Sequence, residues 1–239
     1  MQLIKSDDFI SCIFKIVYPL HDTHIMKNTF IFDLDGTLLN TLEDLSNSVN
    51  YALAANQLPI RSTEDIRCAL GNGIQVLIEK SVPQQTNPAI VEKVLTTFRA
   101  YYLKHSMDHT APYDGIIDLL KILKQRKIHT AIVSNKLDPA VQELYQRFFS
   151  EYIDIAIGEQ QPIVRRKPYP DMVNLALHKL ETTTEEAIYI GDSEVDLQTA
   201  TNTGIDCVSV SWGFRSRTFL EDLGATNIID TPMQLLSRY

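Results

Sequence analysis

Acidic side chains directly follow two apolar segments of the sequence. Asp33 and Asp35 come after residues 29–32, and Asp192 comes after a second apolar segment. Two carboxylates two residues apart can face the same side of an extended backbone, and Gly36 permits the chain to turn sharply after them. Carboxylate oxygens are the ligands that a hard divalent cation such as Mg²⁺ prefers. An isolated Asp-X-Asp-Gly sequence is also typical of a simple turn, so this pattern alone leaves both interpretations open.

Two other segments carry groups that can bind phosphate oxygens. Ser134 and Asn135 follow the apolar residues 129–133, and Lys167 lies in the sequence Arg-Arg-Lys-Pro-Tyr-Pro-Asp. A hydroxyl and an ammonium can hold phosphoryl oxygens while carboxylates bind a cation, and this combination suits phosphoryl transfer. Taken singly, Ser134 and the polar residues 191–196 could equally be helix-capping sequences.

The elements that would position these side chains alternate between short apolar strands and amphipathic helices. This alternation predicts an α/β fold with a doubly wound, Rossmann-like parallel sheet. The carboxyl ends of parallel strands meet at one edge, so Asp33, Ser134 and Asp192 are expected to lie together. The predicted strands are residues 29–32, 129–133, 153–157, 187–190 and 207–210, and the helices between them are residues 115–126, 138–148, 169–180 and 194–203.

One interval breaks this alternation, because the sequence from about Thr41 to His109 has a helical pattern throughout. Four helices are expected in residues 41–57, 62–70, 73–81 and 87–106, separated by proline and glycine turn signals. Ser62 and Asp65 resemble a capping box at the start of the second helix. So long a helical insert indicates a separate helical subdomain rather than a crossover between strands.

Composition and charge exclude several classes of protein. The chain has 239 residues, 44% of them hydrophobic, and a net charge of −8 from 22 basic and 30 acidic residues. A nucleic-acid-binding surface would normally be basic, so no nucleic-acid partner is expected. Three scattered cysteines (Cys12, Cys68 and Cys207) suggest neither disulfides nor a zinc site, and a reducing cytoplasm fits them best.

The sequence gives no sign of a membrane partner or a leader. No stretch reaches eighteen apolar residues, as a membrane-spanning helix would need. The apolar residues 9–20 are not expected to be a signal peptide, because Lys15 interrupts them and Asp7 and Asp8 stand where positive charge should be. Met26 opens what reads as the start of a domain, so residues 1–25 are interpreted as an N-terminal extension of unknown role.

Four sequence motifs, taken in order, resemble those of the haloacid dehalogenase superfamily of phosphatases. They are FDLDGTL, VSNK, KPYPD and GDSEVD, and the resemblance covers about residues 28–230. It implies an α/β core domain over residues 26–41 and 112–239, and a small helical cap domain over residues 42–111. Within the cap, residues 66–73 resemble the cap loop of phosphoglycolate phosphatases. Residues 211–215 resemble a segment that follows the sheet in that subfamily and in its pyrophosphatase relatives.

The resemblance implies roles for the two acids of the first motif and for the cation. Asp33 would be the nucleophile that forms an aspartyl-phosphate, and Asp35 would be the general acid and base. Mg²⁺ would be held by the Asp33 side chain, the Asp35 backbone carbonyl and Asp192, with Asp196 supporting them from just outside.

The same resemblance assigns the residues that contact the substrate. Ser134 and Lys167 would hold the phosphoryl oxygens, and Lys167 would keep Asp33 ionised. Thr37 would brace the loop after the first strand, and Asn135 would contribute through its backbone or side chain. The cap loop would approach the substrate through the following residues: Arg67, Gly71, Asn72 and Gly73. A surface arginine on a helix is an equally good interpretation of Arg67.

The resulting hypothesis is a magnesium-dependent phosphatase that acts on a small phosphorylated metabolite. The two cap-loop glycines favour a compact anionic substrate, foremost 2-phosphoglycolate. A pyrophosphatase, a sugar-phosphate phosphatase and a phosphomutase remain alternatives, as does a non-catalytic binding protein. A dehalogenase is disfavoured because a departing halide does not need the acid that Asp35 supplies. We expect a monomer or a homodimer.

Two other groups of residues in the helical interval have structural interpretations. His105 and His109 have the spacing of a helical metal site, but no third ligand accompanies them. The aromatic residues Phe98, Tyr101 and Tyr102 are interpreted as part of the cap core rather than as a surface for stacking bases.

Overall fold

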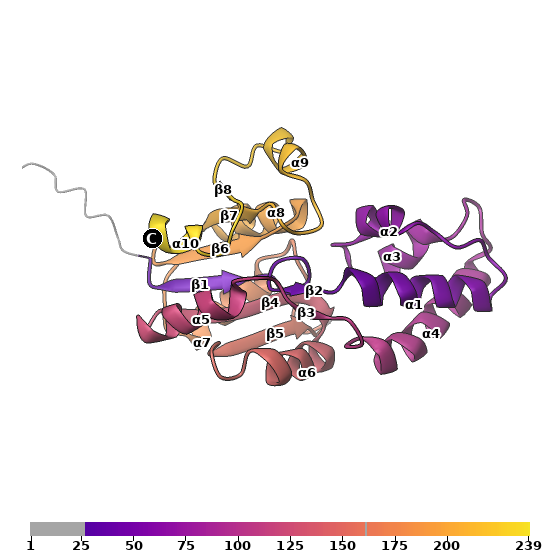
Figure 1. The fold of residues 1–239 in the computed structure, drawn as a ribbon, viewed down its shortest axis with the longest axis horizontal. Coiled ribbons are helices and arrows are strands. Elements are labelled where there is room, and N and C mark those ends of the chain that lie inside the picture. Colours follow the sequence, from indigo (N-terminus) through magenta and orange to yellow (C-terminus); the bar gives the residue numbers. More distant parts are fainter. Residues whose placement is uncertain (1–26, 161) are drawn as a thin grey trace, which may run out of the picture.

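The computed structural model describes residues 27–160 and 162–239 (Figure 1). The predicted N-terminal extension, including Cys12 and the apolar residues 9–20, lies outside the described residues. No helix in the described part of the chain is long and apolar enough to span a membrane.

A six-stranded sheet of parallel strands forms the core, in the order β5-β4-β1-β6-β7-β8. The strand β1 lies at its centre, where Thr29 pairs with His129 of β4 on one side and with Ala187 of β6 on the other. The strands of this sheet are β1 (Thr29–Phe32), β4 (His129–Leu137), β5 (Ile155–Glu159), β6 (Ala187–Gly191), β7 (Asp206–Val210) and β8 (Ile228–Ile229). The predicted doubly wound α/β fold is confirmed.

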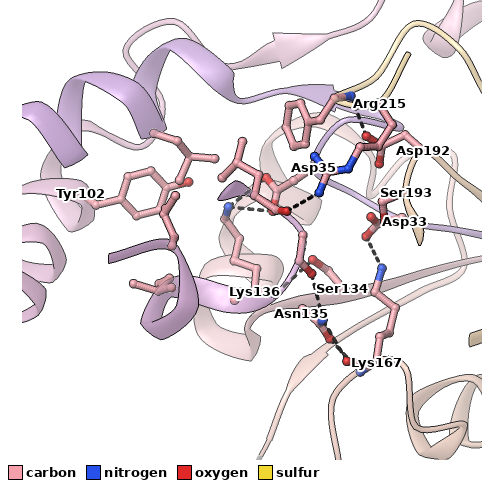
Figure 2. Close-up of a pocket in the computed structure, with 17 residues that line it drawn as sticks. Asp33, Asp35, Tyr102, Ser134, Asn135, Lys136, Lys167, Asp192, Ser193 and Arg215 are labelled. Carbon is pink, nitrogen blue, oxygen red and sulfur yellow. Dashed lines mark hydrogen bonds and ion pairs between the residues drawn. The ribbon is translucent and has the colours of Figure 1, made fainter. Parts of the chain in front are cut away.

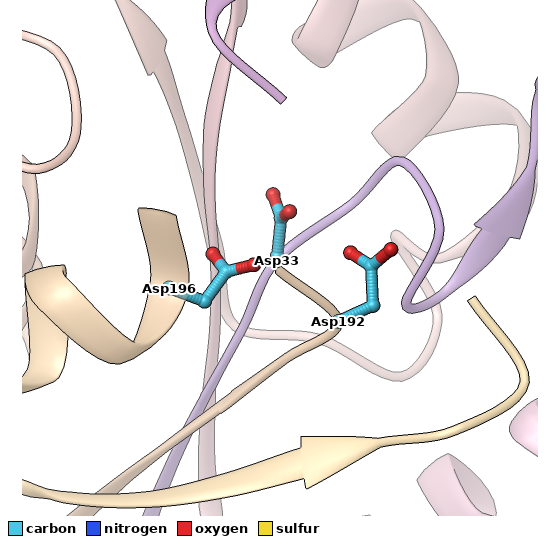
Figure 3. A group of neighbouring side chains, drawn as sticks. All are labelled: Asp33, Asp192 and Asp196. Carbon is cyan, nitrogen blue, oxygen red and sulfur yellow. The ribbon is translucent and has the colours of Figure 1, made fainter. Parts of the chain in front are cut away.

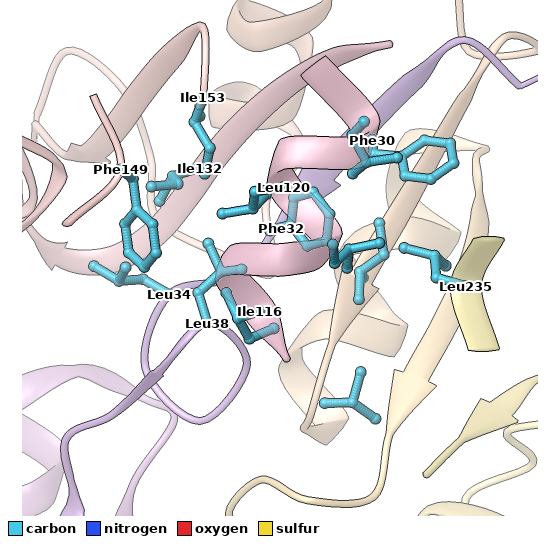
Figure 4. Close-up of a cluster of buried hydrophobic side chains, with 14 of the residues drawn as sticks. Phe30, Phe32, Leu34, Leu38, Ile116, Leu120, Ile132, Phe149, Ile153 and Leu235 are labelled. Atoms are coloured by element: carbon cyan, nitrogen blue, oxygen red, sulfur yellow. The ribbon is translucent and has the colours of Figure 1, made fainter. Parts of the chain in front are cut away.

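Helices cover both faces of this sheet because its strands are apolar on both sides. Phe30 and Phe32 point toward one face, where α5 packs (Figure 4), whereas Ile31 lies in the cluster on the other face. Strands buried on both faces read as continuous apolar segments, which is the pattern seen in the sequence. The core helices are α5 (Ile116–Gln125), α6 (Asp138–Phe148), α7 (Asp171–Lys179), α8 (Glu194–Thr203), α9 (Arg217–Asp222) and α10 (Gln234–Arg238).

Four of the five predicted strands have different bounds in the structure, by a single residue in β6 and β7, and three short strands were not predicted. The strand β4 continues to Leu137, beyond its predicted end at residue 133, and β5 begins at Ile155 instead of residue 153. The pairing of β4 with β5 shifts register between Val133 and Leu137, so an irregular polar segment is retained within the strand. The unpredicted strands β2 (Leu39–Asn40), β3 (Ala111–Pro112) and β8 are only two residues long, too short to show a period in the sequence.

The helical insert lies beside the carboxyl edge of the sheet and has its own apolar core (Figure 1). It consists of α1 (Leu42–Ala55), α2 (Thr63–Ala69), α3 (Gly73–Ser81) and α4 (Pro88–His105). Ser62 caps α2 as expected, because its hydroxyl accepts a hydrogen bond from the Asp65 backbone. The exact boundaries of the predicted cap and core domains remain a prediction.

The two connections between the sheet and the helical insert are joined by a buried carboxylate. The strands β2 and β3 pair with each other at these connections. Asp44 of α1 accepts hydrogen bonds from the backbone N–H of His109 at 3.0 Å and of Thr110 at 2.9 Å, and from the Thr110 hydroxyl at 2.8 Å. The His109 ring also lies 2.9 Å from Asp44, so this histidine is engaged at the connection. His105 pairs instead with Asp108.

We expect Asp44→Asn to lower the free energy of unfolding by about 2 kcal/mol near neutral pH, because buried donors lose a charged acceptor. Burial alone would raise the pKa of Asp44, but the hydrogen bonds from Thr110 and His109 outweigh it and lower that pKa below its ordinary 3.8. The stabilisation is therefore present above the ordinary pKa and is lost as the pH falls through the folded-state value.

Urea unfolding at about pH 5.5 and about pH 3 checks this expectation, since the difference between wild type and variant should shrink at the lower pH. Glu92→Gln is the matched control, because Glu92 is an exposed carboxylate on α4 of the same helical insert. A difference that stays constant over this range would contradict the role given to Asp44.

Candidate active site

Three buried carboxylates meet at the carboxyl edge of the sheet. Asp33 follows β1, Asp192 follows β6, and Asp196 lies in the first turn of α8 (Figure 3). Each offers a carboxylate oxygen, and these oxygens lie within 4.8 Å of one another. The predicted convergence of strand ends thus brings Asp33 and Asp192 together.

Lys167 lies between two of these carboxylates. Its ammonium is 2.8 Å from Asp33 and 2.7 Å from Asp196, and the side chain is only 2% exposed. Burial, followed by the charge of Asp196, raises the pKa of Asp33 to about 7, although Lys167 opposes this shift. Burial would lower the pKa of Lys167, but the two carboxylates outweigh it and keep this amine charged.

Asp192 is held by a backbone N–H and a hydroxyl, not by a lysine or arginine side chain. The Phe214 N–H donates to one of its oxygens at 2.7 Å, and the Thr37 hydroxyl approaches the other at 3.4 Å. Any side chain at Gly36 or Gly213 would collide with this carboxylate, so both positions require glycine. Burial, with the charges of Asp196 and Asp33, raises the pKa of Asp192 well above its ordinary value. This carboxylate therefore favours a positive partner.

Asp196 has both oxygens engaged by the protein. One accepts hydrogen bonds from Lys167 and from the Tyr189 hydroxyl at 3.1 Å. The other accepts from the backbone and hydroxyl of Ser193 at 3.1 and 2.6 Å. The arrangement fits a residue that supports the site and fixes Lys167.

Asp35 lies apart from this cluster and pairs with a second lysine. The Lys136 ammonium donates to the two oxygens of Asp35 at 2.9 and 3.0 Å, and lies 5.1 Å from the centre of the Tyr102 ring (Figure 2). Lys136 is not among the site residues predicted from the sequence. Its position directly after Ser134 and Asn135 could have indicated that Lys136 belongs to the site.

Asn135 connects the lysine loop to the helical insert. Its side-chain oxygen accepts from the Lys167 backbone N–H at 2.7 Å, and its amide donates to the carbonyls of Lys167 and Gly71 at 3.1 and 3.3 Å. Ser134 lines the same pocket as Asp33 and Lys167. The structure therefore brings these predicted phosphate-binding residues to one place.

The four cap-loop residues assigned to the substrate are not equivalent. Gly71 and Gly73 line the pocket, with φ of 105° and 81°, whereas Asn72 is not among its lining residues. Arg67 is directed to Glu64, with which it forms a paired ion contact at 2.8 and 2.5 Å, and it does not line the pocket either. The alternative interpretation of Arg67, a surface arginine on a helix, agrees with this placement.

Arg215 also contacts the cap loop, and it is not among the site residues predicted from the sequence. It pairs with Glu194 at 2.7 Å and donates to the carbonyls of Arg67 and Leu70 at 3.1 and 2.9 Å. These bonds fasten the helical insert to the edge of the sheet. Only one feature of the sequence pointed to Arg215: its place in residues 211–215, the segment that follows β7.

Comparison with known proteins agrees with the geometry. Residues 30–210 match the family described as haloacid dehalogenase-like hydrolase. The chain belongs to this family.

Its relatives include proteins with two different names. A phosphoglycolate phosphatase of Pseudomonas savastanoi pv. phaseolicola is 30% identical over 86% of this chain and 77% of its own. A pyrophosphatase PpaX of Listeria welshimeri is 29% identical over 87% of this chain and 94% of its own. The crystal structure of a candidate phosphoglycolate phosphatase from Lactobacillus delbrueckii subsp. bulgaricus superposes with a TM-score of 0.84 at 37% identity, covering 88% of this chain and 97% of that one.

We expect Lys167→Met to lower the free energy of unfolding by about 3 kcal/mol or more, because it leaves Asp33 and Asp196 buried without their cation. Thermal or urea unfolding of the purified variant measures this loss. Lys179→Met, on the exposed surface of α7, is the matched control and should unfold like the wild type. Equal stability of the two variants would refute the role of Lys167 as the charge that holds the cluster.

Proposed function

We propose that this hydrolase is a magnesium-dependent phosphatase that acts on a small phosphorylated metabolite through an aspartyl-phosphate, with 2-phosphoglycolate as the first substrate to test. The observation that carries the proposal is the placement of Asp33 beside Lys167 and Asp192, with Asp35 in the same pocket. The names of the relatives support the substrate class.

The buried carboxylates fit a divalent cation. Asp33 and Asp192 are hard oxygen donors, and burial together with the charge of Asp196 raises the pKa of both. We propose that Mg²⁺ is held by the side chains of Asp33 and Asp192 and by the Asp35 backbone carbonyl. When bound, the cation would neutralise charge on the phosphoryl oxygens.

The residues of the chain would perform the reaction in two steps. A carboxylate oxygen of Asp33 attacks phosphorus, the bond from phosphorus to the leaving oxygen breaks, and Asp35 gives its proton to that oxygen. Asp35 then takes a proton from a water that attacks the phosphorus of the aspartyl-phosphate. This releases inorganic phosphate and restores both carboxyl groups. Lys167 and Ser134 bind the phosphoryl oxygens in both steps, and Thr37 and Asn135 brace the surrounding loops.

Pyrophosphate is the second candidate substrate, because one relative is a pyrophosphatase. A sugar phosphate and a phosphomutase reaction would use the same aspartyl-phosphate. A panel of phosphoglycolate, pyrophosphate, sugar phosphates and nucleoside monophosphates, assayed with Mg²⁺ for phosphate release, tests the proposal. Release from none of them would refute it and favour a non-catalytic binding protein.

We expect turnover to require a divalent cation, because Asp33 and Asp192 would otherwise repel each other and the phosphate group. Exhaustive chelation followed by an assay of phosphate release should abolish activity, and added Mg²⁺ should restore it. Full turnover by the chelated protein would exclude the proposed metal role.

The two aspartates of the first motif should differ when each is replaced by asparagine. Asp33→Asn removes the nucleophile and should lower kcat by at least about a thousandfold. Asp35→Asn keeps the nucleophile but loses the acid and base, so kcat should fall by roughly 10²–10⁴ and phosphorylated protein should accumulate. Acid quenching and mass measurement detect that species. A phosphorylated protein in the Asp33→Asn variant would disprove the assignment.

A further inference from the structure

The half of the pocket that faces the helical insert contains a polar group with no partner. The Tyr102 hydroxyl is buried, with 6% of the residue exposed, and it has no hydrogen-bond partner among the described residues. Tyr102 belongs to α4, and Figure 2 shows its hydroxyl pointing into the pocket. A buried hydroxyl without a partner is costly for the protein alone, so it marks a place where a ligand can provide the missing acceptor.

Lys136 offers a second donor to the same space. It is 8% exposed and lies beside the Tyr102 ring. An ammonium has three N–H donors, and two of the Lys136 donors reach the oxygens of Asp35. The third makes no hydrogen bond within 3.5 Å among the described residues, and it faces the Tyr102 hydroxyl, which lies near enough to influence the pKa of Lys136. The other two cations that line the pocket lie beside other groups: Lys167 lies between Asp33 and Asp196, where the phosphoryl group is proposed to bind, and Arg215 pairs with Glu194.

The remaining walls of this half are apolar and close together. They are formed by Leu45, Leu70, Ile74, Leu77 and Phe214. The cavity volume of the whole pocket is only about 70 Å³. The several hydroxyl groups of a sugar would lie unpaired against these side chains, so a short leaving group with one polar end fits best.

We infer that Lys136 and Tyr102 form the subsite that binds the carboxylate of a phosphorylated 2-hydroxy acid, an inference that rests on the proposed function. Two donors match the two oxygens of a carboxylate. Lys136 is hydrogen-bonded to Asp35, the group that protonates the leaving oxygen. A carboxylate on the carbon next to that oxygen therefore falls beside Lys136.

The same geometry argues against a second phosphate in this subsite. A phosphate has three terminal oxygens and more charge, and one of these oxygens would face the apolar wall without a donor. Pyrophosphate is therefore expected to be the poorer substrate. Tyr102 is accordingly a specificity-determining residue, although its sequence position looks like cap core.

The test compares two substrates of similar size, 2-phosphoglycolate and ethyl phosphate, which differ in having a carboxylate or a methyl group. Tyr102→Phe should lower the ratio of their kcat/KM values at least about tenfold, because a hydrogen bond to a charged group is lost. Tyr101→Phe is the matched control on the same helix. Tyr101 stacks on Tyr51 at 4.0 Å and does not line the pocket, so this variant should keep the wild-type ratio.

Two further measurements show whether a lower substrate ratio in Tyr102→Phe comes from lost binding or from damage to the fold. Since the Tyr102 hydroxyl has no partner, Tyr102→Phe should unfold at a temperature no lower than the wild type. Calorimetry of 2-phosphoglycolate with Asp33→Asn protein and Mg²⁺ should show a Kd at least about tenfold weaker once Tyr102→Phe is added.

Particular outcomes separate this inference from the proposed function. An unchanged substrate ratio and an unchanged Kd in Tyr102→Phe, or a wild-type preference for pyrophosphate or ethyl phosphate, would overturn the inference while leaving a phosphatase. Failure of the wild type to release phosphate from any ester would refute the proposed function. The calorimetric comparison would still decide whether Tyr102 binds the carboxylate.

Discussion

The arrangement of this protein depends on holding three carboxylates in a buried site with one ammonium among them. Asp33, Asp192 and Asp196 repel one another, and burial removes the water that would otherwise screen them. Lys167 compensates only part of this charge, since it pairs with two of the three. When all three acids are ionised, the deficit left over is two charges, the charge of one divalent cation. This imbalance is unfavourable for the fold alone, and a divalent cation would relieve it.

Several local features of the sequence exist because of that cluster. Gly36 and Gly213 allow two loops to approach Asp192 more closely than any side chain would permit. The Phe214 N–H then supplies a donor where a second lysine would have cancelled the charge. Asn135 fixes the backbone of Lys167 and reaches the Gly71 carbonyl in the helical insert. The position of the insert is thus tied by hydrogen bonds to the residue that neutralises the acids.

The sequence predicts the fold well wherever one pattern repeats over a whole element. The strand β1 and the helices α3, α6 and α8 have the expected bounds, because each has an uninterrupted apolar or amphipathic pattern. The prediction of β4 stops too early since Ser134, Asn135 and Lys136 are polar, yet they remain extended as its buried end. Asp33 and Asp192 could be placed together from topology alone. The pairing of Arg67 with Glu64 follows from their i,i+3 spacing on a predicted helix. The hydrogen bonds from Arg215 to the carbonyls of Arg67 and Leu70 could not be foreseen, because the sequence does not show the partner to which a long side chain turns.

The residues proposed to react and those proposed to select the substrate lie in different parts of the molecule. Membership of the family therefore indicates the type of reaction but not the substrate. The proposed reacting groups, Asp33 and Asp35, follow the end of β1, where their place in the motif fixes them. The walls around the leaving group come largely from α1, α3 and α4, whose residues satisfy the pattern of any amphipathic helix. Relatives named phosphoglycolate phosphatase and pyrophosphatase match this chain equally well over most of its length. Overall identity therefore does not distinguish their substrates. In the proposed subsite the buried Tyr102 hydroxyl on α4 would distinguish them, because a hydroxyl without a protein partner responds to the shape and charge of the group beside it.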